Sequence, residues 1–128
     1  VDEDTVFIGR SLGPALILRV LEKSRKKIRA SFLIAGFIGD VGDESDGERK
    51  TFFAKKFNWK KVKSNCNKFV FIGSTNDPYV PPKMTRELAK KLGEKVIMVK
   101  NAGHFNTNSG YTKFPLLLKL VNNELKKK

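Results

Sequence analysis

The chain has 128 residues, of which 40% are hydrophobic, and carries a net charge of +13 at neutral pH. This composition supports a single domain with its own core, and no apolar run of about 18 residues predicts a membrane span. Because Cys66 is the only cysteine, an internal disulfide is excluded. We therefore expect a reducing, cytoplasmic location, with Cys66 as a small packing residue.

The excess of basic side chains lies in residues 49–128, so a nucleic-acid partner has to be weighed. The lysines, however, are spread over predicted helix faces and the C-terminal tail, and no RNA- or DNA-binding motif accompanies them. We interpret them as a solvated lysine-rich surface. Nucleic-acid binding is therefore the weakest of the alternative functions.

The first elements in chain order are a strand, a turn and a helix. Val6–Ile8 is a predicted strand, the residues from Leu12 to about Lys27 have the spacing of a helix, and Ser31–Phe37 is a second strand. Residues 40–48 are acidic and rich in glycine, but they do not follow the ligand order of an EF-hand loop. We expect a solvated loop there and no metal site.

The rest of the chain continues the alternation of strands and helices. After an aromatic connector at residues 51–58, the predicted elements are a short helix Trp59–Asn65, a strand Lys68–Ile72, a helix Pro82–Leu92, a strand Lys95–Val99 and a closing helix Thr112–Lys126. Gly93 ends the second of these helices, and Pro115 falls in the first turn of the last one. The pattern predicts an α/β fold, a parallel sheet with flanking helices, as one domain over residues 1–128.

A serine lies between two glycines at the first turn, in the segment Gly9-Arg10-Ser11-Leu12-Gly13. A serine at a sharp strand-to-helix turn is the context of a nucleophile elbow, in which the glycines let the backbone turn without side-chain clashes. The backbone N–H of Leu12, at the start of the helix, would be one oxyanion-hole donor. Ser11 is therefore a candidate nucleophile, although it is also acceptable as a small residue in an ordinary turn.

A serine hydroxyl needs an imidazole to take its proton and a carboxylate to orient that imidazole. His104, the only histidine, follows the strand at 95–99, and Asp77 follows the strand at 68–72. Sites form at the carboxyl ends of parallel strands, and the order Ser, Asp, His is that of α/β-hydrolases. Each residue alone fits a turn or loop, but together they predict a Ser11, Asp77, His104 triad. Asp40, which also follows a strand, is the alternative acid.

Five segments carry a resemblance to a known family: residues 9–13, 57–59, 64–66, 73–81 and 103–106. The chain resembles the small serine hydrolases of the RBBP9/YdeN type over nearly its whole length. The resemblance implies a compact α/β-hydrolase domain with little or no lid. It also implies Ser11 as the nucleophile, His104 as the base and Asp77 as its partner. No metal or organic cofactor is implied. Arg10 occupies a position at which this family commonly has histidine.

The resemblance begins in the middle of the family's domain. We therefore expect the C-terminal part of an α/β-hydrolase fold, incomplete at the N-terminus, with opening strands of roughly sixty residues missing. Val6–Ile8 would then be an exposed edge strand, covered by the missing segment, by a second copy of the chain or by a partner. The second oxyanion donor, from a loop after an earlier strand, would lie outside this sequence.

The expected function is that of a serine hydrolase that cleaves a small ester or amide through an acyl-enzyme. The main alternative is a non-catalytic protein-binding module that keeps the triad without a complete oxyanion hole. Some relatives are associated with a retinoblastoma-type pocket through an L-x-C-x-E motif, which this chain lacks. Five aromatic residues indicate a partly apolar substrate pocket: Phe52, Phe53, Phe57, Tyr79 and Phe105.

Overall fold

The structure is a computed structural model that describes residues 1–39, 53 and 55–127. Within these residues, four parallel strands form one sheet in the order β1 (Val6–Arg10), β2 (Ala30–Ile34), β3 (Phe69–Ser74) and β4 (Val96–Val99). The helices are α1 (Gly13–Lys23), α3 (Trp59–Ser64), α4 (Pro82–Lys91) and α5 (Pro115–Lys126). The prediction of an α/β fold with a parallel sheet is confirmed.

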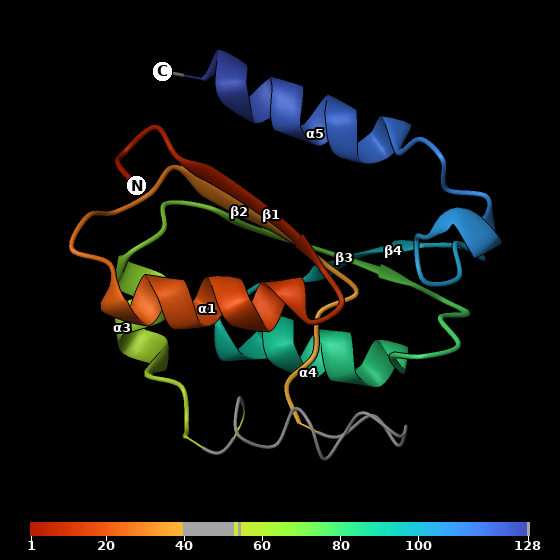
Figure 1. The fold of residues 1–128 in the computed structure, drawn as a ribbon, viewed down its shortest axis with the longest axis horizontal. Coiled ribbons are helices and arrows are strands. Elements are labelled where there is room, and N and C mark those ends of the chain that lie inside the picture. The colour runs from red at the N-terminus through yellow and green to blue at the C-terminus, as the bar shows by residue number, and fades with distance from the viewer. Residues whose placement is uncertain (40–52, 54, 128) are drawn as a thin grey trace.

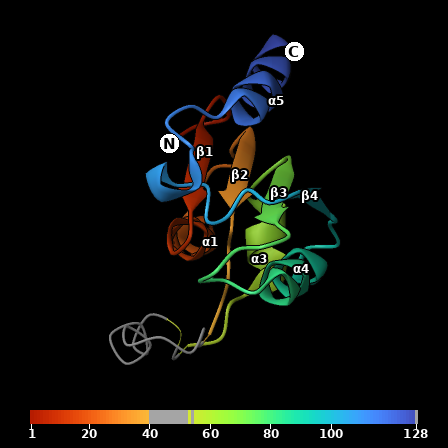
Figure 2. The ribbon, with the colours of Figure 1, turned by 90° about the vertical axis from the view of Figure 1, so that its right-hand side faces the viewer.

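The sheet lies between two layers of helices, with α1, α3 and α4 on one face and α5 on the other (Figures 1 and 2). Leu18 of α1 and Leu33 and Phe71 of the central strands pack in the first layer, and all three are fully buried. On the other face, Leu117 and Leu120 of α5 pack against a second cluster that contains Ile34 and Ile72. Consecutive strand residues therefore serve opposite cores, as the alternation of side chains in a strand requires.

Several elements are shorter than their sequence pattern predicts. The first helix ends at Lys23 because Ser24 has extended backbone angles, with φ −68° and ψ 139°. The second strand ends at Ile34 because Ala35 adopts a left-handed φ of +50°. The last helix begins at Pro115, whose missing N–H is not needed in the first turn. Gly93 ends α4 with a φ of +72°, as expected.

The described sheet is exposed along its first strand. β1 pairs with β2 and with no other described strand, and Ile8 is 51% exposed, whereas every residue of β2 is buried. The expectation that Val6–Ile8 forms an edge therefore holds for the part of the chain that the structure describes. This part contains no helix that is both long and apolar enough to cross a membrane.

Cys66 is a free, buried thiol that lies beyond the end of α3, in an isolated parallel bridge with Ile28. Its S–H is 3.1 Å from the carbonyl oxygen of Lys68, to which it donates. Burial raises the pKa of the Cys66 thiol. These observations fit the packing role expected for it. The acidic segment at residues 40–48, including the alternative acid Asp40, lies outside the described residues.

Candidate active site

Ser11 lies between the end of β1 and the start of α1. Its N–H donates to the carbonyl oxygen of Ile34 over 2.9 Å, which extends the pairing of β1 with β2 by one residue. Its φ is +62°, in the left-handed region that a residue with a Cβ seldom adopts. Such backbone strain is concentrated at functional sites, so the turn has the geometry of a nucleophile elbow.

The two glycines of this turn have different roles. A Cβ on Gly9 would lie 2.9 Å from the backbone carbon of Gly13 and 2.9 Å from Cδ1 of Ile17, so only glycine lets α1 approach β1 this closely. A Cβ on Gly13 would meet no atom of the described residues within 4 Å. The expectation that both glycines avoid clashes is therefore wrong for Gly13, because this residue faces open space in the first turn of α1.

Leu12 forms the N-cap of α1, and its carbonyl oxygen accepts from the N–H of Leu16 over 3.2 Å. Its own N–H donates to no acceptor among residues 1–39, 53 and 55–127. An N–H at the start of a helix carries part of the positive end of the helix dipole. The Leu12 N–H can thus donate to an oxygen that gains negative charge beside Ser11.

Asp77 and His104 form a buried acid–base pair. His104 Nδ1 lies 2.8 Å from Asp77 Oδ2, and the two side chains are 9% and 2% exposed. The other carboxylate oxygen, Oδ1, accepts from the backbone N–H of Tyr79 over 2.8 Å and of Val80 over 2.9 Å. Three hydrogen bonds therefore fix the carboxylate. A carboxylate at this place favours the neutral tautomer with its proton on Nδ1, in which Nε2 is free to accept a proton.

Two further side chains contact His104. The ring of Tyr79 lies edge-on to the imidazole, with centroids 5.1 Å apart, and Tyr79 is 52% exposed. Arg10 Nη1 donates to the carbonyl oxygen of His104 over 3.3 Å, so the residue before Ser11 reaches the histidine loop. Ser11 and His104 make no hydrogen bond with each other, although both residues are described. Such bonds are often long before substrate binds.

The structure thus brings Asp77 and His104 into direct contact, and Ser11 follows the carboxyl end of β1 at the same end of the parallel sheet. The contact of Arg10 with His104 was not predicted from the sequence. The available signal was an arginine directly before the candidate nucleophile, at a position where this family commonly has histidine.

Four of the five aromatic residues expected in the pocket are described, and of these Tyr79 has its ring against the imidazole of His104. Phe105 instead packs in the core against the rings of Tyr111 and Phe114. Phe53 and Phe57 line a separate hollow of about 450 Å³. Phe52 lies outside the described residues. The expected role in a substrate pocket is therefore wrong for Phe105, because its side chain is needed in the core.

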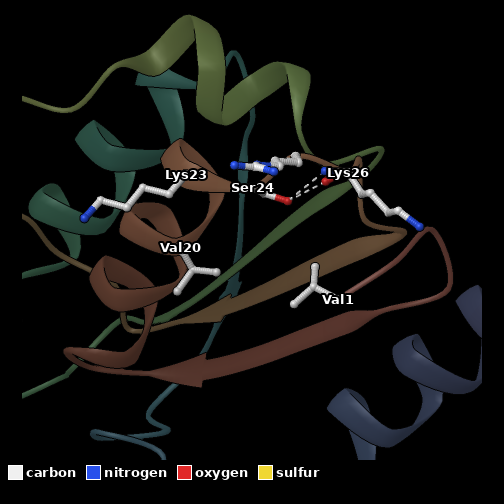
Figure 3. A pocket seen from close by; sticks show the side chains of 6 residues that line it. Val1, Val20, Lys23, Ser24 and Lys26 are labelled. Carbon is white, nitrogen blue, oxygen red and sulfur yellow. Dashed lines mark hydrogen bonds between the residues drawn. The ribbon is translucent and has the colours of Figure 1, made fainter.

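Another hollow of about 450 Å³ lies at the opposite end of α1 from Ser11 (Figure 3). Its lining comes from the end of that helix, the residues that follow it and the N-terminus: Val1, Val20, Lys23, Ser24, Arg25 and Lys26. It contains no member of the candidate triad. Volume alone therefore does not identify the candidate active site in this molecule.

A family model described as "Serine hydrolase" matches residues 1–123, which include Ser11, Asp77 and His104. The chain belongs to the serine hydrolase family. It is 32% identical to serine hydrolase RBBP9 of Rattus norvegicus over 124 residues, 97% of this chain and 63% of that protein. It is 27% identical to the YdeN protein of Bacillus subtilis over 117 residues, 90% of this chain and 60% of that protein. The chain thus spans about three fifths of the length of these curated relatives.

Solved structures show the same fold. The ydeN gene product of B. subtilis aligns with a TM-score of 0.88 and 23% identity, covering 99% of this chain and 68% of that one. The esterase domain of a Rhodothermus marinus protein aligns with a TM-score of 0.62 and 15% identity, covering 92% of this chain and 60% of that one. The fold is that of α/β-hydrolases.

Proposed function

We propose that this chain carries the catalytic triad of a serine hydrolase that cleaves a small ester or amide through an acyl-enzyme. The observation that carries the proposal is the buried pair of Asp77 and His104, whose carboxylate and imidazole are 2.8 Å apart. The pair and Ser11 all follow the carboxyl ends of parallel strands. The left-handed backbone of Ser11 gives independent support, because such strain needs a reason.

In the first half-reaction, Ser11 Oγ attacks the substrate carbonyl carbon while His104 Nε2 takes the hydroxyl proton. The Leu12 N–H donates to the oxyanion that forms, and Asp77 stabilises the imidazolium through Nδ1–H. The tetrahedral intermediate then collapses: the bond to the leaving group breaks, and His104 returns the proton to that group. An ester between the acyl group and Ser11 Oγ remains.

In the second half-reaction, His104 takes a proton from water, and the resulting hydroxide equivalent attacks the acyl carbon. Collapse of this intermediate breaks the bond to Ser11 Oγ, which regains its proton from His104. The products are a carboxylic acid and the free enzyme. Every proton transfer uses the same nitrogen, so the fixed orientation of His104 by Asp77 serves both halves of the cycle.

The test is the pH dependence of p-nitrophenyl acetate hydrolysis by the wild-type chain and by His104→Ala. The wild-type rate should be lower in acid than in neutral solution, because the reaction needs a base that can accept the proton of Ser11. His104→Ala should lose at least about 10²-fold in rate and the pH dependence with it. Lys119→Ala, an exposed change on α5, is the control and should behave as wild type. An unchanged profile in His104→Ala would exclude His104 as the base.

A further inference from the structure

The pairing of β3 with β4 continues beyond the ends of the strands. The last strand pair is Ser74 with Val99, and the N–H of Thr75 then donates to the carbonyl oxygen of Val99 over 3.1 Å. Thr75 Oγ1 in turn accepts from the N–H of Asn101 over 2.9 Å. Beyond this pair, side chains that follow β3 accept hydrogen bonds from the backbone of the loop after β4.

The next two residues after β3 hold the loop at His104 itself. Asn76 Oδ1 accepts from the N–H of Gly103 over 2.8 Å, and Asp77 Oδ2 pairs with His104 Nδ1 over 2.8 Å. Consecutive residues of one loop thus hold consecutive residues of the other. Asp77 fixes the imidazole ring, while Asn76 fixes the peptide group between Ala102 and Gly103, one residue before His104.

The orientation of the Asn76 amide is itself determined. Its Oδ1 also accepts from the hydroxyl of Ser74 over 3.0 Å, and Ser74 is only 1% exposed. Two donors, the Ser74 hydroxyl and the Gly103 N–H, therefore bind Asn76 Oδ1 and fix its position. An asparagine supplies that acceptor beside Asp77 without adding a second negative charge.

Ser109 contacts the same two residues from the other side. Gly103 has a φ of +59°, and a Cβ there would lie 2.2 Å from Ser109 Oγ. The same hydroxyl accepts from the N–H of His104 over 3.3 Å and donates to Asn106 Oδ1 over 2.8 Å. Residues 103 and 104 are thus held from both sides, by Asn76 and by Ser109.

We infer that Asn76 is a positioning residue for the acid–base pair. Its side-chain oxygen sets the place of the His104 backbone and so allows Nδ1 to meet Asp77. Asn76 acts only through Gly103 and His104 and does not touch the reacting atoms. The expected effect of Asn76 on the rate rests on the proposed function. Its expected effect on the geometry of the Asp77–His104 pair does not depend on any activity.

The kinetic test compares Asn76→Ala, which removes the acceptor, with Asn76→Asp, which keeps one. With p-nitrophenyl acetate, Asn76→Ala should lower kcat by about 10²-fold and leave KM nearly unchanged, because it misplaces the base and not the bound ester. Asn76→Asp should recover most of the loss. Asn122→Ala removes an exposed amide from α5 and should match wild type. An unchanged kcat in Asn76→Ala would overturn the inference.

The second readout is the proton resonance of the imidazole Nδ1–H, recorded on protein labelled with ¹⁵N-histidine. Because His104 is the only histidine, one downfield signal should report its hydrogen bond to Asp77. The signal should persist in Asn122→Ala and Asn76→Asp and be lost in Asn76→Ala. A signal that is unchanged in Asn76→Ala would overturn the inference. A wild-type chain without esterase activity would contradict the proposed function, while loss of the signal in Asn76→Ala would still support the positioning role.

Discussion

Two substitutions of Asp77 should have different effects on activity and on stability, because the two carboxylate oxygens of Asp77 have different partners. In Asp77→Asn, the amide oxygen can keep the N–H groups of Tyr79 and Val80, while the NH₂ group faces His104 Nδ1. A donor at that place forces the imidazole proton onto Nε2, where the base is needed. We expect kcat to fall by about 10⁴-fold, with little change in Tm.

Asp77→Ala should add a large loss of stability. It leaves the N–H groups of Tyr79 and Val80 without their acceptor. Val80 is 2% exposed, so water does not easily replace the carboxylate there, whereas Tyr79 is 52% exposed. One orphaned buried donor costs about 1–3 kcal/mol, which corresponds to a fall in Tm on the order of 5–10 °C.

The assays are the rate of p-nitrophenyl acetate hydrolysis and thermal unfolding, followed by circular dichroism at one pH and ionic strength. Both variants should lose activity, and only Asp77→Ala should lose stability. A wild-type rate in Asp77→Asn would refute the assignment of the acid. Equal Tm values for the two variants would refute the structural role assigned to Oδ1.

Three further predictions concern the scaffold. Gly9→Ala should destabilise the fold by about 1–3 kcal/mol through overpacking, whereas Gly13→Ala should be neutral or slightly stabilising; equal denaturation midpoints would contradict this. Burial opposes ionisation of Glu22, but the N–H of Asn58 and the guanidinium of Arg19 outweigh it and lower its pKa. Its contribution to stability is therefore present above the unfolded-state pKa and lost as pH falls through the lower folded-state pKa. Glu22→Gln should accordingly lower the Tm at pH 7 and lose this effect in acid, and a pH-independent difference would refute the role. Finally, the 128-residue chain should self-associate through the edge of β1, seen as an average mass that rises with concentration in sedimentation; a monomer at high concentration with strongly protected β1 amides would contradict it.

The strands and the order of the site residues could be predicted from the sequence because they depend on local signals. Short apolar runs such as Phe69–Ile72 predict buried strands of a parallel sheet, and parallel strands bring the residues after them to one edge. Asp77 and His104 are therefore expected near each other without knowledge of any contact. Their hydrogen bond is an observation of the structure, and the catalytic roles stay predictions.

The parts that sequence reasoning missed depend on contacts between distant residues. The close approach of Gly9 to Gly13 and Ile17 of α1, for example, has no signal in the sequence around Gly9. Likewise, Asn76 has the sequence context of an ordinary turn residue, and its role as an acceptor for the Gly103 N–H depends on how the loop after β4 folds back. Such roles follow from tertiary packing and leave no periodic pattern in the sequence.

The central claim, that Ser11 is the nucleophile, is tested most directly by a fluorophosphonate probe followed by peptide mass spectrometry. The probe phosphonylates an activated serine and stays bound to it. We expect an adduct on Ser11 in the wild-type chain, a much slower reaction in His104→Ala, and no adduct in Ser11→Ala. An adduct on another residue, or undiminished labelling of Ser11→Ala, would contradict it.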